Sequence, residues 1–252
     1  MFRYIDAKHY IIKISLERSK VPGFARYPFN IPAVKELDEI MFHPAVTFFV
    51  GENGAGKSTL IEAIAIAYGF NPEGGSINFT FSTNQTHSEL HKYIKLKKGI
   101  KKPSDGYFLR AESFYNLATN IDEMDDTSDY SPKLINAYGG KSLHKMSHGE
   151  SFLALMLNRF RGNGLYILDE PEAAMSPSRL LTMISRIHQL VKQGSQFIIS
   201  THSPILMAYP DSCIYMIDDK GINEISYEET DHFIITKQFM NNRQALLNEL
   251  LK

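Results

Sequence analysis

Several features that mark other classes of protein are missing from this 252-residue sequence. Cys213 is its only cysteine, so the chain has neither an internal disulfide nor a C-x-x-C pair to hold a metal through thiolates. A chain of this kind suits a reducing compartment, and we expect a cytoplasmic protein. No apolar run approaches the roughly 20 residues of a membrane helix. Residues 10–16 have the pattern of a strand rather than a signal peptide, so direct membrane insertion is not expected.

An excess of one charge is also missing, because 27 Lys and Arg stand against 28 Asp and Glu. A balanced chain has no global attraction to nucleic acid or anionic lipid. Locally, a basic cluster could meet DNA phosphates, although lysines on an edge strand also block unwanted pairing, and DNA is therefore only a weakly supported partner. An acidic run at residues 122–129 indicates an exposed loop. The basic cluster comprises Lys92, Lys95, Lys97, Lys98, Lys101 and Lys102.

Residues 51–58 form a phosphate-binding pattern. They read Gly51-Glu52-Asn53-Gly54-Ala55-Gly56-Lys57-Ser58, which matches the G-x-x-x-x-G-K-[ST] loop of nucleotide triphosphatases. Small residues let successive backbone N–H groups curl around the phosphates, the lysine adds a point charge, and the serine hydroxyl ligates Mg²⁺. We therefore expect ATP or GTP and Mg²⁺ to bind. The predicted nucleotide-binding residues are Asn53, Gly54, Ala55, Gly56, Lys57, Ser58 and Thr59.

The segments around this loop fit the strand, loop and helix order that the pattern requires. Before it, residues 45–50 are apolar, β-branched and aromatic, which is typical of a buried strand. After it, Leu60, Ile64 and Tyr68 recur at helical spacing until Gly69 offers a C-terminal stop. The context supports a true phosphate loop.

A second buried strand is followed by two adjacent acids. The apolar residues 165–168 lead into Asp169-Glu170-Pro171-Glu172, and α/β sheets bind ligands at the carboxyl ends of their strands. Side chains alternate along a strand, so one acid can hold Mg²⁺ while the other faces an attacking water. Acids also end strands before ordinary turns, but the phosphate loop in the same chain favours the functional interpretation.

A third strand brings a histidine to the same edge of the sheet. A helix is predicted from Ser176 and Pro177, an N-cap and a first-turn proline, to about Gly194. The strand at residues 196–200 follows and delivers His202. A lone histidine often does no more than cap a turn, yet the position at a strand end predicts contact with the γ-phosphate.

A helix start lies between the phosphate loop and the acidic strand. Ser147 and Glu150 form S-x-x-E, a capping box, ahead of an amphipathic helix that ends near Gly162. This pattern opens many helices and has no catalytic meaning by itself. A helix N-terminus nonetheless attracts anions, because its unpaired N–H groups and its dipole face whatever lies in front.

In this order the motifs resemble those of the ATP-binding-cassette (ABC) ATPases. The phosphate loop, Ser147-His148-Gly149-Glu150, Leu168-Asp169-Glu170-Pro171 and His202 correspond to Walker A, signature, Walker B and switch histidine. The group resembled most closely is the small stand-alone bacterial AAA/ABC-like ATPases related to RecF-type and structural-maintenance-of-chromosomes heads. The resemblance implies an α/β P-loop fold with a mostly parallel central sheet, an antiparallel N-terminal β portion and a small helical lobe carrying the signature.

In that family the signature of one subunit closes over ATP held by the Walker A loop of another. The resemblance therefore implies an ATP-dependent homodimer in which Ser147, Gly149 and Glu150 contact the nucleotide. Carried onto the matching positions, it assigns catalysis to Lys57, Glu170 and His202, and metal binding to Ser58 and Asp169.

The chain departs from the family pattern in places. His148 and Glu150 stand where the usual signature has a glycine and a glutamine. The metal-sensing glutamine expected between Walker A and the signature has Glu112 as its best positional candidate. For the aromatic residue that stacks on adenine, Tyr27 and Phe29 are candidates, although core packing explains either at least as well.

We expect residues 1–252 to form a single ABC-type ATPase domain, with a helical signature lobe at about 110–160 and an insert at about 71–107. The stretch from Lys57 to Ser147 leaves no room for a long coiled-coil arm and has no sustained heptads. Smaller elements are predicted as a short strand at 77–81, a hairpin of 213–217 with 222–227, and a terminal helix at 243–251.

These observations predict a soluble Mg²⁺-dependent ATPase. Hydrolysis would drive a conformational change in a partner protein, in DNA maintenance or defence against phage by analogy with related heads. One alternative is the nucleotide-binding subunit of a membrane transporter, although the glutamines expected for that role are missing. Another is a nucleotide-gated interaction module with little hydrolysis. A GTPase is less favoured, since the sequence has no Asn-Lys-x-Asp motif.

Overall fold

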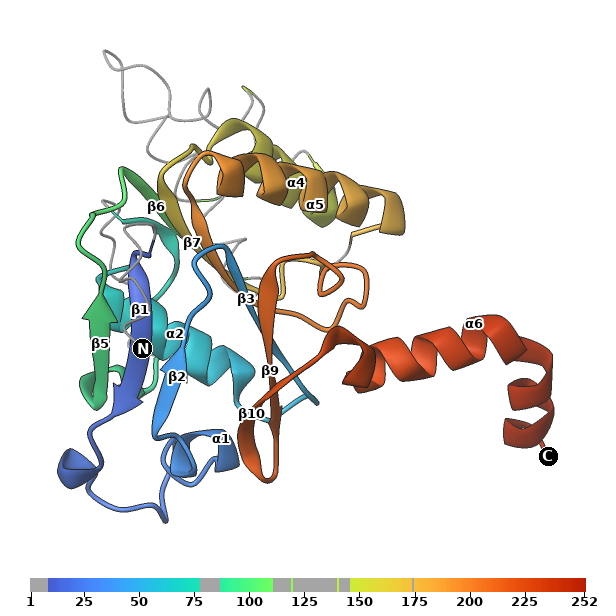
Figure 1. Cartoon of the computed structure of the whole chain (residues 1–252), viewed down its shortest axis with the longest axis horizontal. Coiled ribbons are helices and arrows are strands. Elements are labelled where there is room, and N and C mark those ends of the chain that lie inside the picture. The colour runs from blue at the N-terminus through green and yellow to red at the C-terminus, as the bar shows by residue number, and fades with distance from the viewer. Residues whose placement is uncertain (1–8, 78–86, 111–118, 120–139, 141–145, 174) are drawn as a thin grey trace, which may run out of the picture.

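The computed structural model describes residues 9–77, 87–110, 119, 140, 146–173 and 175–252 (Figure 1). Its main helices are α1 (Pro32–Lys35), α2 (Lys57–Tyr68), α4 (His148–Asn158), α5 (Pro177–Lys192) and α6 (Asp231–Leu250). Its strands are β1 (Ile11–Leu16), β2 (Glu39–Met41), β3 (Val46–Val50), β4 (Gly75–Ser76), β5 (Ile94–Lys98), β6 (Asp105–Arg110), β7 (Gly164–Asp169), β8 (Gln196–Ser200), β9 (Ser212–Asp218) and β10 (Gly221–Ile225).

The strands form two sheets. The larger has seven strands in the order β10-β9-β3-β8-β7-β6-β4, and its inner five run parallel while β10 and β4 pair antiparallel at the edges. Strands β3, β7 and β8 are buried along their whole lengths, as expected of parallel strands covered on both faces. The smaller sheet, β2-β1-β5, is antiparallel. The predicted fold class, α/β with a mostly parallel sheet and an antiparallel N-terminal portion, is confirmed.

Alternate side chains of the central strands feed two cores on opposite faces of the larger sheet. Phe48 packs in the core that also contains Leu155 of α4 and Ile187 of α5. Its neighbour Phe49 packs in the other core with Ile61 of α2. Figure 1 shows α2 between the larger sheet and the small antiparallel one, and α4 beside α5. This layering holds the N-terminus of α2 at the carboxyl end of β3.

Most predicted elements match the structure. The helix after the phosphate loop is α2, and it stops at Gly69, whose φ of +122° suits a glycine. The predicted hairpin is the antiparallel pair β9 and β10. The short strand predicted at 77–81 lies largely outside the described residues, next to β4. Much of the predicted lobe at 110–160, including Glu112, and the acidic run at 122–129 also lie outside them.

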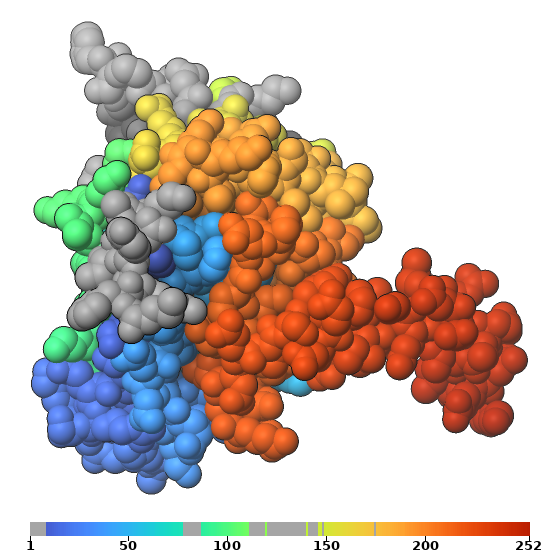
Figure 2. All heavy atoms as spheres, viewed as in Figure 1, coloured from blue at the N-terminus to red at the C-terminus, as the bar shows by residue number. Residues whose placement is uncertain are grey.

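The predicted extent of the terminal helix was wrong. Helix α6 begins at Asp231 rather than near Arg243, and it continues across a kink at Asn242. The helix buries none of its residues, so no apolar face packed on the core was needed in its sequence to mark where it begins. Figure 2 shows this C-terminal segment projecting from the rest of the molecule. None of the helices in the described ranges combines the length and apolar character needed to cross a membrane.

The basic cluster lies on and beside an edge strand. Strand β5 stands at one end of the small sheet, next to β1. Lys95, Lys97 and Lys98 are all exposed there, and Lys98 also donates a hydrogen bond to the Tyr68 carbonyl. The next strand along the chain, β6, belongs to the larger sheet. The placement fits the edge-protecting interpretation of these lysines.

Candidate nucleotide-binding site

The phosphate loop turns between β3 and α2 through glycines with left-handed backbones. Gly51, Gly54 and Gly56 have φ values of +144°, +82° and +101°. A Cβ on Gly51 would lie 2.2 Å from the Ile217 carbonyl oxygen of β9, so only glycine fits there. Gly56 is the N-cap of α2 and brings no side chain to cap the helix. The first N–H groups of α2 are therefore left for an anion.

Lys57 stands in the first turn of α2 with its ammonium group over the loop. Its Nζ donates to the carbonyl oxygens of Gly51 and Glu52, each 2.9 Å away. Burial lowers the pKa of Lys57, and nearby carboxylates, Glu170 and Asp169 first, oppose that shift. The lysine is thus a charge held close to the loop, as phosphate binding requires.

Asp169 and Ser58 meet although they stand far apart in the sequence. Asp169 ends β7, and its Oδ1 accepts hydrogen bonds from Ser58 Oγ at 3.1 Å and from Ser200 Oγ. Ser200 is its register partner on β8. Burial raises the pKa of Asp169 to about 6, because water no longer solvates the carboxylate. A hydroxyl beside a carboxylate is an oxygen donor set that fits Mg²⁺.

Glu170 turns away from the strand through an unusual backbone conformation. Its φ is +50°, which is uncommon for a residue with a side chain. Its N–H is held by the carbonyl and the hydroxyl oxygens of Ser200, at 3.2 and 3.1 Å. The side chain lines the same cavity as Lys57 and Ser58. A strained backbone that aims a carboxylate into a cavity is typical of functional sites.

His202 lies beside Glu170. Its Nε2 is 3.3 Å from Glu170 Oε1, and its backbone N–H donates to the carboxylate of Glu172. Burial raises the pKa of Glu172. On its other side, His202 Nδ1 lies 3.3 Å from His232 Nε2, at the start of α6.

The sequence prediction missed Glu172 and His232 as site residues. Glu172 belongs to the quoted acidic motif, and a third acid in that motif was the available signal. His232 follows no motif, stands 30 positions after His202 in a weakly patterned segment, and could not have been found without the structure.

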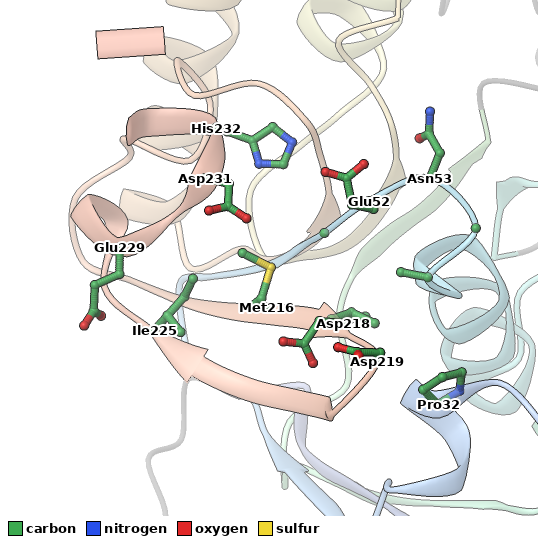
Figure 3. Close-up of a pocket in the computed structure, with 14 residues that line it drawn as sticks. Pro32, Glu52, Asn53, Met216, Asp218, Asp219, Ile225, Glu229, Asp231 and His232 are labelled. Carbon is green, nitrogen blue, oxygen red and sulfur yellow. The ribbon is translucent and has the colours of Figure 1, made fainter. Parts of the chain in front are cut away.

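Two cavities flank the phosphate loop. The first, of about 530 Å³, is lined by Lys57, Ser58, Thr59 and Glu170, and by Asn53, Gly54 and Gly56 of the loop. The second, of about 560 Å³, also touches Asn53 and Gly54 but has Ala55 and several acids on its walls (Figure 3). Its carboxylates would repel a triphosphate, which favours the first cavity for an anionic ligand. The acids around the second cavity are Glu52, Asp218, Asp219, Glu229 and Asp231.

The structure separates the two candidates for adenine stacking. Phe29 is fully buried and packs edge-on against Tyr93, with ring centroids 4.9 Å apart. It is a core residue, and its prediction as an adenine contact was wrong because its ring is not accessible. Tyr27 is 60% exposed, lines the first cavity, and places its hydroxyl 3.4 Å from Thr59 Oγ1. Tyr27 remains the candidate.

The signature segment forms the predicted capping box. The Ser147 N–H donates to Glu150 Oε2 at 3.0 Å, and Glu150 Oε1 pairs with Arg179 at 2.7 Å. Ser147 and Glu150 are exposed, while Gly149 is buried. Ser147, Gly149 and Glu150 are all absent from the lining of the cavity that contains Lys57. Within one chain, the signature therefore stays separate from the phosphate loop.

Comparisons with known proteins agree with these motifs. A family model described as an AAA domain matches residues 23–151, and a second AAA-domain model, described for an AbiEii toxin of a type IV TA system, matches residues 138–208. The energy-coupling factor transporter ATP-binding protein EcfA of Methanosphaera stadtmanae is 26% identical over 83% of this chain and 80% of its own. The cobalt import ATP-binding protein CbiO of Salmonella typhimurium is 25% identical over 75% of this chain and 73% of its own.

A solved structure, the SMC head domain from Thermotoga maritima, aligns with 86% of this chain and 99% of its own. The sequence identity is 18% and the TM-score is 0.42.

Proposed function

The chain belongs to the AAA-domain family of P-loop ATPases, of the ABC type, and from this premise we propose that it is a Mg²⁺-dependent ATP hydrolase. The observation that carries the proposal is the 3.1 Å contact between Ser58 Oγ and Asp169 Oδ1. This contact brings the end of the phosphate loop to the end of the acidic strand. Ser58 and Asp169, the two predicted metal ligands, therefore lie side by side. Ser58 and Asp169 would hold Mg²⁺, which neutralises charge on the phosphate oxygens when it is bound.

The residues of the first cavity and the neighbouring His202 divide the chemistry of hydrolysis among them. Lys57 and the N-terminus of α2 attract the negative phosphates. Glu170 accepts a proton from the attacking water as the water oxygen bonds to the γ-phosphorus and the bond to the ADP oxygen breaks. His202 donates a hydrogen bond from Nε2–H to the γ-phosphate and so stabilises the negative charge on the phosphate.

We propose that the active form is a homodimer that closes on ATP. Ser147 and Glu150 are exposed and lie apart from the cavity of their own chain, so they are available to a second copy. In the variant Glu170→Gln, slow hydrolysis should trap this dimer. Size-exclusion chromatography should then show a dimer with Mg-ATP and a monomer without it, and adding Ser147→Arg should abolish the dimer. If the single variant Glu170→Gln stays monomeric with Mg-ATP, the closed dimer is refuted.

The central test of function is ATP turnover by the purified chain at low salt, with Glu170→Gln as the background. Wild-type turnover well above that background supports the hydrolase, and turnover equal to it contradicts the hydrolase and favours the nucleotide-gated module. Single- and double-stranded DNA are then added. We propose a role in DNA maintenance or phage defence, and DNA stimulation that is lost in the Lys95→Ala/Lys97→Ala variant would support it.

A second candidate function is favoured by the names of two relatives, an energy-coupling factor transporter ATP-binding protein and a cobalt import ATP-binding protein. In that case the chain would power a membrane partner. An ATP turnover rate that does not change when DNA is added, together with co-purification of a multi-span membrane protein, would support this candidate over the first.

A further inference from the structure

The loop that carries His202 is tied to the first turn of α6. His202 Nδ1 and His232 Nε2 are 3.3 Å apart, and their rings are tilted by 57°. The hydroxyl of Tyr227, in the short helix η5 (Tyr227–Glu229), donates to the Pro204 carbonyl at 2.9 Å. The buried Thr230 then caps α6 by accepting the Phe233 N–H. These contacts hold His232 against His202.

The Glu170 carboxylate favours a hydrogen on Nε2 of His202, because the two groups are close, although they do not have the alignment of a hydrogen bond. Glu170 Oε1 lies 3.3 Å from His202 Nε2, and an ionised carboxylate can only accept. The contact is attractive only when Nε2 is protonated. A neutral His202 then has a bare Nδ1, which needs a donor, and the ring nitrogen of His232 supplies one.

A side chain that can both donate and accept suits this position, and histidine is one. When His202 is neutral, His232 donates from Nε2 to the bare Nδ1. When His202 takes up a second proton, its Nδ1 becomes a donor, and a His232 with its hydrogen on Nδ1 accepts at Nε2. A carboxylate could only accept and a lysine could only donate. The imidazole of His232 can therefore stay paired with His202 Nδ1 in both charge states, and in the neutral state this pairing favours the hydrogen on Nε2.

The surroundings of His232 keep its own ring neutral. Burial is the main cause that lowers the pKa of His232, with smaller contributions from His202 and Lys57, while Glu52 and Asp231 oppose them. Figure 3 shows the His232 ring at the wall of the acidic cavity, near Asp231 and Glu52. A neutral imidazole has one donor and one acceptor nitrogen, which is what the pair requires.

We propose that His232 is a positioning residue for hydrolysis, which directs the Nε2 hydrogen of His202 toward Glu170 and the γ-phosphate. The proposal rests on the proposed ATPase function. The proposed role belongs to a residue outside the Walker and signature motifs. Through His202, it connects the first turn of α6 with the γ-phosphate of the nucleotide.

The first measurement compares the ATP kinetics of His232→Phe and His232→Gln. Phenylalanine keeps the ring and removes both nitrogens, whereas the glutamine amide can donate or accept at the position of Nε2. We expect His232→Phe to lower kcat about tenfold with KM for ATP within about twofold, and His232→Gln to recover most of kcat. The matched control is His188→Phe, which removes a histidine that contacts Tyr209 Oη at 3.1 Å, and it should leave kcat unchanged.

The second measurement reads the His202 tautomer without any turnover. In ¹⁵N NMR spectra of the nucleotide-free protein, with the signal assigned by its loss in His202→Gln, wild type and His232→Gln should show hydrogen on Nε2. His232→Phe should shift the pair of ¹⁵N signals toward a mixture of tautomers. Full kcat in His232→Phe, or an unchanged tautomer whatever the kcat, would overturn the proposal. If wild type turns over no faster than Glu170→Gln, the ATPase function fails, whereas the tautomer spectrum still tests the histidine pair.

Discussion

The first glycine of the phosphate loop is expected to be far less tolerant of a side chain than the second. In Gly51→Ala the new Cβ would lie 2.2 Å from the Ile217 carbonyl oxygen and 3.1 Å from its carbon. Those atoms belong to β9, which is paired with β3 on one side and with β10 on the other. The neighbour is therefore backbone held in a sheet and cannot move aside as a flexible side chain would.

The magnitude follows from two terms. An alanine in a left-handed conformation costs about 1–2 kcal/mol, and overpacking against fixed atoms costs about 1–3 kcal/mol more. Gly51→Ala should therefore lose roughly 2–5 kcal/mol of unfolding free energy, a large part of a typical total of about 5–15 kcal/mol. At Gly54, with φ +82°, an added Cβ meets nothing within 4 Å. Gly54→Ala should lose only about 1 kcal/mol, because the stiffer unfolded chain offsets part of the conformational cost.

Urea unfolding of wild type and both alanine variants, followed by circular dichroism at one pH and salt, measures the difference. The urea midpoint should fall strongly in Gly51→Ala and slightly in Gly54→Ala, with similar slopes. If the two variants lose equal stability, the close approach between the loop and β9 does not constrain the protein, and the reasoning is wrong.

Three further predictions concern the site. Asp169→Asn should be more stable than nucleotide-free wild type at pH 7.5 and equal to it near pH 4. The pKa of Asp169 is about 6 in the folded protein against an ordinary value of 3.8. The protonated group therefore stabilises the fold fully below pH 3.8, and this contribution, up to about 3 kcal/mol, is lost as pH rises through 6. Urea midpoints across that range check the sign, and ATP turnover of this variant should be abolished. Glu150→Ala should lower the urea midpoint by removing the capping box, and the loss should shrink below pH 4.5 because the Ser147 hydrogen bonds hold the pKa of Glu150 below that value; Glu150→Gln, which keeps an acceptor, should lose less. Tyr27→Ala should raise KM for ATP with little change in stability, whereas Phe29→Ala should cost about 3–5 kcal/mol of unfolding free energy, so equal effects of the two on KM would contradict the assignment.

Several features were determined by the sequence alone because their chemistry is local. The phosphate loop needs glycine backbones, a lysine and a hydroxyl at set spacing, and the residues from Gly51 to Ser58 contain all of them in consecutive positions. Strands β3 and β7, on either side of β8, were predicted from their apolar runs. The capping box at Ser147 and Glu150 depends on residues three positions apart. Patterns of this kind can be recognised without knowing how the rest of the chain folds.

The remaining features were decided only by the tertiary structure. That β8 lies between β3 and β7, which brings Ser58, Asp169 and Ser200 together, depends on the pairing of β3 with β8, whose residues stand more than a hundred positions apart. Burial separated Phe29 from Tyr27, two aromatic residues that sequence alone could not distinguish. The contact of His202 with His232 arises because the chain after β10 returns to the carboxyl edge of the sheet before α6 begins. Such contacts are set by how layers pack, and no short-range pattern records them.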